Sequence, residues 1–176
     1  MKIGNYSLYS IVTSKFSLDG GAMFGIIPKP LWEKEAPADS HNRIKMVTRS
    51  LLLVSTDRKI IVDTGNGEKW QKKFSDIYDI DTKTVSLNSS LKHHGYSPEE
   101  ITDVFCTHLH FDHAGGNTRL DGGKVVPTFP NATYWIQTKN WDLANSPSEK
   151  DQGSFMADDW SVLVENNMVE VVDGKD

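Results

Sequence analysis

The feature that most constrains this chain is a cluster of histidines and one aspartate placed directly after an apolar segment. Three of the six histidines lie in the run His108-Leu109-His110-Phe111-Asp112-His113. The segment before it, Val104-Phe105-Cys106-Thr107, is rich in β-branched and aromatic residues and predicts a buried strand. Imidazole and carboxylate groups together are typical ligands of divalent transition metals. The cluster therefore predicts a metal site at the end of a strand.

The spacing within this cluster divides the candidate ligands into two pairs. In an extended segment His108 and His110 point to the same side of the backbone and can converge on one ion. The bend through Asp112 directs Asp112 and His113 toward a second ion. The alternative is a chance group of solvated histidines at a loop tip. The buried strand before the cluster and the glycines of Ala114-Gly115-Gly116-Asn117 after it disfavour that alternative, and we expect these glycines to let the backbone approach the metals closely.

Apolar periodicity along the rest of the chain predicts strands and helices in alternation. No internal repeat or low-complexity tract is present. This succession favours an α/β layered fold in one domain. The predicted strands are 6–18, 45–55, 60–62, 104–107, 132–138 and 169–172, and the predicted helices are 68–78, 84–94, a short one starting at Ser97, 139–144 and 158–166.

A long segment, 20–42, separates the first two predicted strands after an expected turn at Asp19-Gly20-Gly21. It contains three prolines, yet it also carries Met23, Phe24, Ile26, Ile27, Leu31 and Trp32. Two interpretations are open: the segment covers an edge of the core, or it is an arm that contacts substrate or forms a homodimer. Phe24, Trp32 and Phe111 are likewise either core residues or lining of an apolar pocket.

Composition narrows the class of protein. With 19 basic and 24 acidic residues the net charge is -5, which argues against a nucleic-acid-binding surface. One cysteine excludes an intramolecular disulfide, and Cys106 is expected to be a core thiol rather than a ligand. The sequence has no apolar run long enough for a membrane span and no signal-peptide pattern at Met1. We expect a cytoplasmic protein that acts on a small molecule.

The motif Thr107-His108-Leu109-His110-Phe111-Asp112-His113 resembles the H-x-H-x-D-H signature of the metallo-β-lactamase superfamily. The flanking residues are most similar to its lactonase and organophosphate-hydrolase branch. Asp63-Thr64-Gly65, Ser97-Pro98-Glu99-Glu100-Ile101 and the segment 19–25 match that branch as well. This resemblance implies an αββα sandwich, of which the chain supplies the N-terminal half or somewhat more.

The same resemblance implies a metal-dependent hydrolase. His108 and His110 would bind the first metal, and Asp112 and His113 the second. Asp63 would orient a ligand histidine from outside the ligand set, although a turn aspartate is the alternative. Two divalent ions, zinc above iron or manganese, would share a hydroxide that attacks a lactone, carboxylic ester or similar bond. Asp112 would also act catalytically, orienting the hydroxide and carrying a proton.

Two other functions stay open beside hydrolysis. One is a metal-dependent oxidoreductase of the same fold, similar to persulfide dioxygenases. Diiron members of the superfamily carry Glu at the position of His110, so His110 favours hydrolysis. The other is an inactive truncated half-domain that only pairs with another chain.

Counting ligands sets the expected extent of the chain. The superfamily uses a third histidine, a bridging aspartate and a last histidine after the motif, whereas no histidine follows His113 here. A catalytic zinc has three protein ligands plus water, and each metal would receive only two from this chain. Of the upstream histidines, His93 and His94 fit a helix end, and His41 has a weak claim to a pocket. We therefore expect residues 1–176 to be a single metallo-β-lactamase-like domain that is incomplete at its C-terminus and inactive alone.

Overall fold

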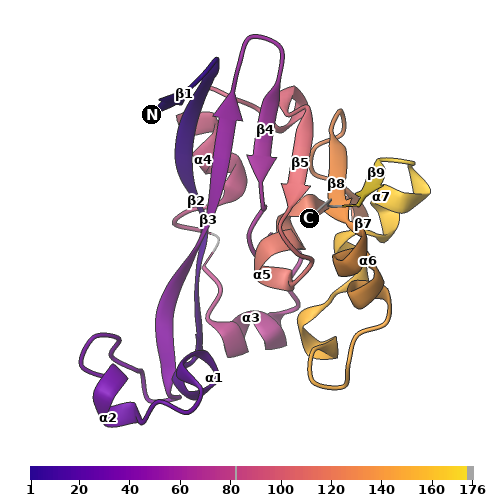
Figure 1. The fold of residues 1–176 in the computed structure, drawn as a ribbon. Coiled ribbons are helices and arrows are strands. Elements are labelled where there is room, and N and C mark those ends of the chain that lie inside the picture. The colour runs from indigo at the N-terminus through magenta and orange to yellow at the C-terminus, as the bar shows by residue number, and fades with distance from the viewer. Residues whose placement is uncertain (82, 174–176) are drawn as a thin grey trace.

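A seven-stranded mixed sheet forms the centre of the computed structural model, which describes residues 1–81 and 83–173 (Figure 1). The strand order is β1-β2-β3-β4-β5-β8-β9. The strands β1 to β4 pair antiparallel, and β4, β5, β8 and β9 pair parallel. Their bounds are β1 Lys2–Ile3, β2 Tyr6–Asp19, β3 Arg43–Val54, β4 Lys59–Val62, β5 Asp103–Cys106, β8 Thr133–Gln137 and β9 Val169–Val172.

Helical crossovers join the parallel strands, because parallel neighbours cannot be linked by a tight hairpin. The crossover from β4 to β5 contains α3 and α4, that from β5 to β8 contains α5 and a two-stranded hairpin, and that from β8 to β9 contains α6 and α7. This alternation confirms the α/β class. The bounds are α1 Gly20–Phe24, α2 Lys29–Trp32, α3 Lys72–Tyr78, α4 Leu87–His93, α5 Phe111–Ala114, α6 Thr138–Asn145, α7 Ser161–Glu165, β6 Thr118–Asp121 and β7 Lys124–Pro127, with single 3-10 turns η1 Pro98–Glu100, η2 Gly115–Asn117, η3 Gln152–Ser154 and η4 Ala157–Asp159.

The main core lies on one face of the sheet. Strand residues alternate between the two faces, so Leu52, Ile61 and Val104, which are paired across β3, β4 and β5, all point to this face and are fully buried. Leu91 of α4 and Leu163 of α7 pack in the same cluster. Of the expected αββα sandwich, the residues described thus form one large sheet with a helical layer.

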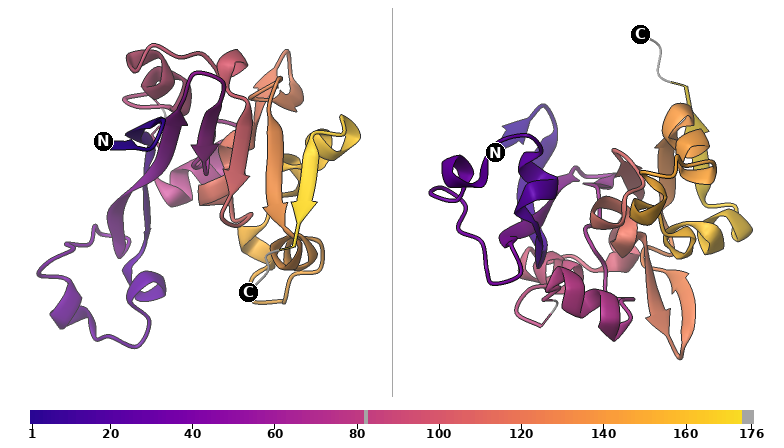
Figure 2. Two further views of the ribbon diagram at one scale, coloured as in Figure 1. Left: turned by 45° about the horizontal axis from the view of Figure 1, so that its top comes forward. Right: turned by 90° about the horizontal axis from the view of Figure 1, so that it is seen from below.

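The strands β2 and β3 continue past the rest of the sheet and carry α1 and α2 at their far end (Figures 1 and 2). We call residues 20–42 the arm. The expected turn at Asp19-Gly20-Gly21 is wrong, because Asp19 caps α1 instead: its Oδ1 accepts a hydrogen bond of 2.8 Å from the Ala22 amide. Within the arm Trp32 is buried and stacks on Phe24 at 4.9 Å between ring centroids. These two aromatics therefore pack on each other.

Several predicted elements differ from the structure in extent. The helix predicted over 68–78 begins only at Lys72, and that over 158–166 is split into η4 and α7. The helix start at Ser97 leads only to the 3-10 turn η1, in which Glu100 Oε2 accepts a hydrogen bond from the Ser97 amide at 2.9 Å. The β6–β7 hairpin was not predicted. Across residues 1–81 and 83–173, no helix is long and apolar enough to cross a membrane.

Candidate metal centre

The four predicted ligands lie in the segment 108–113, which begins two residues after β5 ends at Cys106. Leu109 is fully buried between His108 and His110 and anchors this turn in the core. His110 has extended backbone angles and precedes the first residue of α5, so Asp112 and His113 lie on that short helix. The alternation expected for His108 and His110 is therefore present, with the apolar residue between them pointing inward.

The structure brings these four side chains together. The ring of His108 lies 4.6 Å from that of His110 and 3.9 Å from that of His113, measured between centroids. Asp112 Oδ2 lies 3.5 Å from His113 Nε2. Three imidazoles beside a carboxylate fit a divalent ion by donor type. Within the described part of the chain, however, no three His, Cys, Asp or Glu side chains converge as a metal-binding group.

The pKa values of two of these histidines are shifted in opposite directions. Burial lowers the pKa of His108, and the neighbouring His113 and His110 lower it further, which favours the neutral imidazole that binds metal. Burial also lowers the pKa of His113, but the hydrogen bond that its ring donates to Asp63 and the charges of Asp112 and Asp63 outweigh burial, so that this pKa is raised overall. The carboxylates of Asp63 and Asp112 therefore decide the direction of the pKa shift of His113 but not that of His108.

Asp63 follows β4 and reaches the cluster because β4 and β5 are parallel neighbours whose carboxyl ends meet. Its Oδ1 accepts a hydrogen bond of 2.8 Å from the Thr107 amide. Its Oδ2 lies 2.8 Å from His113 Nδ1, so Nε2, the ring nitrogen beside Asp112, is the one that faces the cluster. Asp63 adopts φ of 57°, a left-handed conformation in which aspartate is tolerated. The predicted contact between Asp63 and a candidate ligand histidine is therefore present.

The glycines after the motif pack against the loop that contains Asp63. The Thr64 amide donates to the His113 carbonyl at 2.7 Å, and the Gly116 amide donates to the Gly65 carbonyl at 3.0 Å. A Cβ on Gly115 would lie 2.3 Å from the Asn66 carbonyl oxygen. We expected the glycines to permit an approach to the metals. In the structure they permit this contact between two loops.

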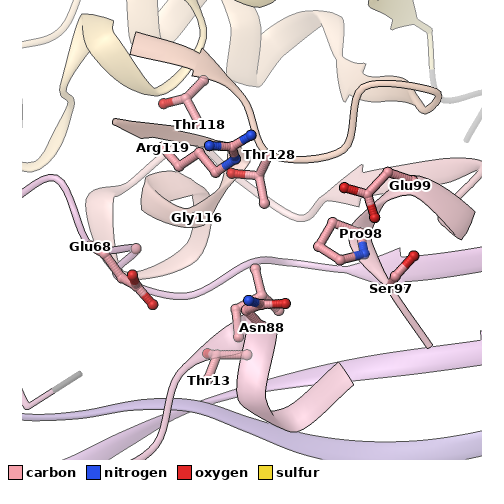
Figure 3. A pocket seen from close by; sticks show the side chains of 12 residues that line it. Thr13, Glu68, Asn88, Ser97, Pro98, Glu99, Gly116, Thr118, Arg119 and Thr128 are labelled. Atoms are coloured by element: carbon pink, nitrogen blue, oxygen red, sulfur yellow. The ribbon is translucent and has the colours of Figure 1, made fainter. Parts of the chain in front are cut away.

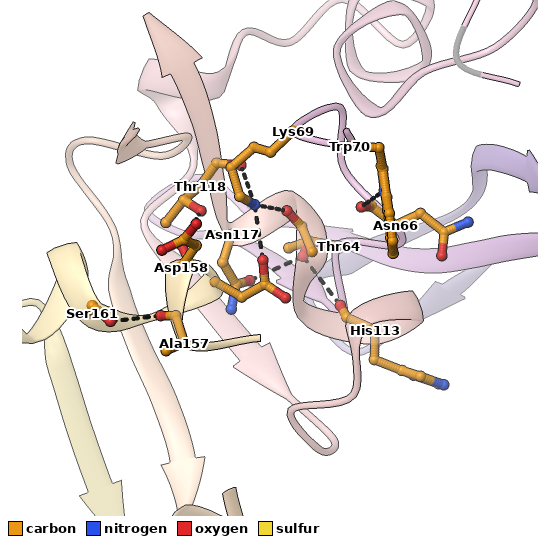
Figure 4. Close-up of polar contacts among 12 residues, drawn as sticks. Thr64, Asn66, Lys69, Trp70, His113, Asn117, Thr118, Ala157, Asp158 and Ser161 are labelled. Carbon is orange, nitrogen blue, oxygen red and sulfur yellow. Dashed lines mark hydrogen bonds and ion pairs between the residues drawn. The ribbon is translucent and has the colours of Figure 1, made fainter. Parts of the chain in front are cut away.

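Sequence reasoning missed Lys69, whose ammonium group lies beside the loop contact (Figure 4). Its Nζ donates to the Gly115 carbonyl at 2.6 Å, to the Thr118 carbonyl at 3.1 Å and to Asp159 Oδ1 at 2.9 Å. The next residue, Trp70, donates its Nε1 hydrogen to the Asn66 carbonyl at 2.8 Å. These contacts lie just before α3, whose N-cap Gln71 has extended backbone angles, so the helix starts at Lys72.

Aromatic side chains surround the cluster. Phe155 packs edge-on against His110 with 4.7 Å between ring centroids. Phe111 is buried and contacts Tyr78 at 5.1 Å and Trp70 at 5.3 Å. Phe111 thus belongs to an aromatic group beside the cluster. Phe155 was not predicted, since nothing in its local sequence indicates a contact with a residue 45 positions earlier.

The other histidines and the cysteine lie elsewhere. His41 lines a surface cavity of about 470 Å³ at the base of the arm, together with Arg43 and Tyr78. His93 is exposed at the end of α4, and His94 packs on Tyr9 at 4.9 Å. Cys106 is buried, and burial raises the pKa of its thiol to about 12, as expected for a core residue.

A separate cavity of about 400 Å³ lies between α4 and the β6–β7 hairpin (Figure 3). Glu68, Asn88, Ser97, Arg119 and Thr128 are among the residues that line it. Its lining includes Gly67 and Gly116 but none of residues 108–113, so it is distinct from the histidine cluster.

Comparison with known families agrees with this geometry. Residues 45–174 match the model of the metallo-beta-lactamase superfamily. The chain belongs to this superfamily. The fold class predicted from the histidine motif is therefore confirmed.

Individual relatives of this superfamily member include lactonases and hydrolases. An N-acyl homoserine lactonase from Bacillus cereus is 33% identical over 94 residues, which are 48% of this chain and 38% of that protein. The crystal structure of a probable metal-dependent hydrolase from Staphylococcus aureus superposes with a TM-score of 0.85 at 29% identity, covering 98% of this chain and 61% of that one. AidC, described as a dizinc quorum-quenching lactonase, shares the fold with a TM-score of 0.72 at 22% identity, covering 98% and 60%. The chain thus spans well under half of the curated relative and about three fifths of the two solved structures.

Proposed function

We propose that this protein is a metal-dependent hydrolase that opens lactones or closely related carboxylic esters. One observation carries the proposal: His108, His110, Asp112 and His113 gather at the end of β5, in a member of the metallo-beta-lactamase superfamily. The relative from Bacillus cereus is an N-acyl homoserine lactonase, which supports a lactone as the substrate class.

In this proposal His108 and His110 bind one divalent ion, and Asp112 and His113 bind a second. Zinc is the first choice, because AidC is described as a dizinc enzyme. When bound, such ions supply Lewis acidity toward a carbonyl oxygen and activate water near neutral pH. The remaining ligands would come from outside the segment 108–113.

The chain's own residues have defined tasks in this chemistry. Asp63 fixes the ring of His113 through Nδ1, so that Nε2 faces the site. Asp112 projects beside His113 Nε2 and can hold a proton on its way to the leaving group. Phe155 covers one side of the His110 ring, and the buried Leu109 anchors the backbone beside it.

The test uses the intact native gene product. Bound metal is quantified, and turnover is measured on N-acyl homoserine lactones, a simple aryl ester and a phosphotriester. We expect two divalent ions per chain and turnover of the lactone. His110→Ala and Asp112→Ala should remove that turnover, whereas the matched variant His93→Ala, at an exposed position on α4, should keep it.

Other outcomes of this test would redirect the proposal. Normal lactone turnover in His110→Ala would overturn it. Iron in the site with oxygen uptake on a persulfide would instead indicate an oxidoreductase, and absence of metal would indicate an inactive domain.

We further propose that the arm forms a homodimer contact. Ile26 is fully exposed, and Met23, Ile27 and Leu31 are between 45% and 64% exposed at the tip of the arm. An apolar group of this kind, carried away from the core of its own chain, is typical of an interaction surface. The cytoplasmic location stays a prediction from composition.

A further inference from the structure

We propose that Lys69 and Asp159 are positioning residues for the loop that contains the candidate ligands. This inference rests on the proposed function, because it assigns the pair a task at that same site. The pair connects the loop after β4 and η4 to residues 115–118, which follow the histidine cluster in the chain (Figure 4).

The ammonium group of Lys69 has one hydrogen-bond acceptor for each of its hydrogens. It has three hydrogens, and its three acceptors are the carbonyls of Gly115 and Thr118 and the carboxylate of Asp159. The Lys69 side chain is 11% exposed and that of Asp159 is 3% exposed. The acceptors lie on two stretches of chain, residues 115–118 and η4, so a displacement of either stretch relative to Lys69 breaks a charge-assisted hydrogen bond.

The carbonyl of Gly115 cannot turn to another donor without moving the loop. Gly115 is wedged against the loop after β4, where a Cβ on Gly67 would lie 2.2 Å from this carbonyl oxygen. Two residues before it, the His113 carbonyl accepts the Thr64 amide hydrogen at 2.7 Å. The orientation of the peptide at Gly115 is therefore transmitted to the backbone of α5, on which Asp112 and His113 lie.

Asp159 connects Lys69 to η4, which follows Phe155 on the opposite side of the histidine cluster. It closes η4, four residues after Phe155, whose ring contacts His110 and whose backbone forms a bridge with it. The Thr118 hydroxyl donates to the Asp158 carbonyl at 2.7 Å, and the Ser161 hydroxyl donates to the Ala157 carbonyl at 2.7 Å. Anchoring η4 to Lys69 thus places Phe155 against a candidate ligand.

The charged character of the buried Lys69–Asp159 pair indicates that it positions the loop more than it stabilises the fold. Burial raises the pKa of Asp159 despite the nearby charge of Lys69, so keeping this carboxylate ionised has a cost. Its Oδ2 is buried without a hydrogen-bond partner among the residues described. Apolar replacement of a buried ion pair is often neutral or stabilising. An apolar pair could fill this space, but it could not direct the carbonyls of Gly115 and Thr118.

The experiment compares the double variant Lys69→Met/Asp159→Leu with the wild type as the intact native gene product. The probe is Co²⁺, and both its affinity and its visible absorption spectrum are measured, together with the thermal unfolding of the metal-free protein. The matched control is Arg58→Met/Asp103→Leu, which removes another ion pair with an almost fully buried carboxylate, at the opposite end of β5 from the histidine cluster. Asp159→Asn is the conservative variant, because it retains an acceptor for Lys69.

We expect Lys69→Met/Asp159→Leu to fold with a melting temperature no lower than that of the control. Its Co²⁺ affinity should fall about tenfold, as when groups outside a ligand set are changed, with an altered spectrum. Asp159→Asn and the control should bind Co²⁺ as the wild type does. Wild-type affinity and spectrum in the double variant would overturn the inference, and so would an equal loss of affinity in the control.

If the double variant does not fold, Lys69→Arg replaces it. A guanidinium holds its donors in one rigid plane, unlike the rotatable ammonium, so we expect Lys69→Arg to fold, to lose part of the three-acceptor arrangement and to show the same altered spectrum. A wild-type spectrum would overturn the inference.

Amide hydrogen exchange separates this inference from the proposed function. In the metal-free double variant, the Thr64 and Gly116 amides should exchange about tenfold faster, while the amides of β8 stay unchanged. If the wild type binds metal but turns over no lactone, the proposed function fails and the affinity comparison still decides the inference. If the wild type binds no metal, the exchange rates alone decide it, and unchanged rates at Thr64 and Gly116 would overturn it.

Discussion

At the scale of single residues, Asp63 connects the backbone to the candidate metal centre. One carboxylate oxygen accepts the Thr107 amide hydrogen and the other faces His113 Nδ1, each at 2.8 Å. Both ends of the segment that carries the ligands are thus tied to one side chain. A residue in this position controls the orientation of a ligand without binding the metal.

We therefore predict that Asp63→Asn folds but binds metal about tenfold more weakly. Asparagine tolerates the left-handed backbone of position 63, yet its amide has lost the charge and one of the two acceptors. Co²⁺ titration of the intact native gene product measures the effect. Asp79→Asn is the control, since Asp79 also has a left-handed backbone, with φ of 48°, and lies at the end of α3. Equal affinities in the two variants would contradict the prediction.

The sequence was informative about single residues only where the chemistry is contiguous. His108, His110, Asp112 and His113 lie within six residues, so their proximity could be predicted from spacing. Asp63 was assigned through the family resemblance. Lys69 and Phe155 were missed because their partners lie up to 90 positions away and a surface-like lysine gives no local sign of burial.

At the scale of elements, the site depends on two loops that approach each other through glycine. The contact lies between the loop after β4 and η2. A Cβ on Gly115 would come within 2.3 Å of the Asn66 carbonyl oxygen, and that oxygen belongs to the backbone, so no side-chain rotation relieves the clash.

Gly115→Ala should consequently destabilise the protein by about 1–3 kcal/mol, the usual cost of overpacking. Gly153→Ala in η3 is the matched control, because a Cβ there meets nothing within 4 Å. It should be neutral or stabilising by about 0.4–1 kcal/mol. The midpoints of urea unfolding at constant slope compare the variants. A Gly115→Ala protein as stable as the wild type would show that the loops are not packed so closely.

Most elements were predicted to within a few residues, and the largest omission has a physical explanation. The β6–β7 hairpin turns at Gly122 and Gly123, whose φ values of 56° and 80° suit a two-residue turn with both residues left-handed. The glycine pair was a usable signal. The flanking strands give no clear apolar pattern beside it, because they have only four residues each and are largely polar or partly exposed.

At the scale of the whole molecule, the two faces of the sheet differ. One face is covered by helices, whereas the other exposes Leu51 (36%), Phe105 (40%) and Val172 (38%). Trp135 stacks on Phe105 on this second face. An apolar second face is what a sandwich of two sheets requires. The order of seven strands could not have been derived from periodicity, because it depends on pairings between strands more than 40 residues apart, such as β4 with β5.

The arm leads to a prediction about the oligomeric state of the molecule. Its tip exposes Ile26 completely and Leu31 to 64%, while Trp32 supports the arm from inside. If the tip buries these two side chains against a second copy, each contributes about 1.5–3 kcal/mol to association. Ile26→Ser/Leu31→Ser should then raise the dimer dissociation constant about a hundredfold or more, since 1.4 kcal/mol corresponds to a factor of about ten.

Sedimentation equilibrium over a range of concentrations measures that constant. Leu143→Ser removes an apolar side chain of 41% exposure from α6, remote from the arm, and should leave the dimer intact. Neither variant should change the melting temperature of the monomer by more than a few degrees, because exposed side chains contribute little to folding. A wild type that is monomeric at all concentrations, or a dimer that survives both arm substitutions, would place the arm outside any contact between copies.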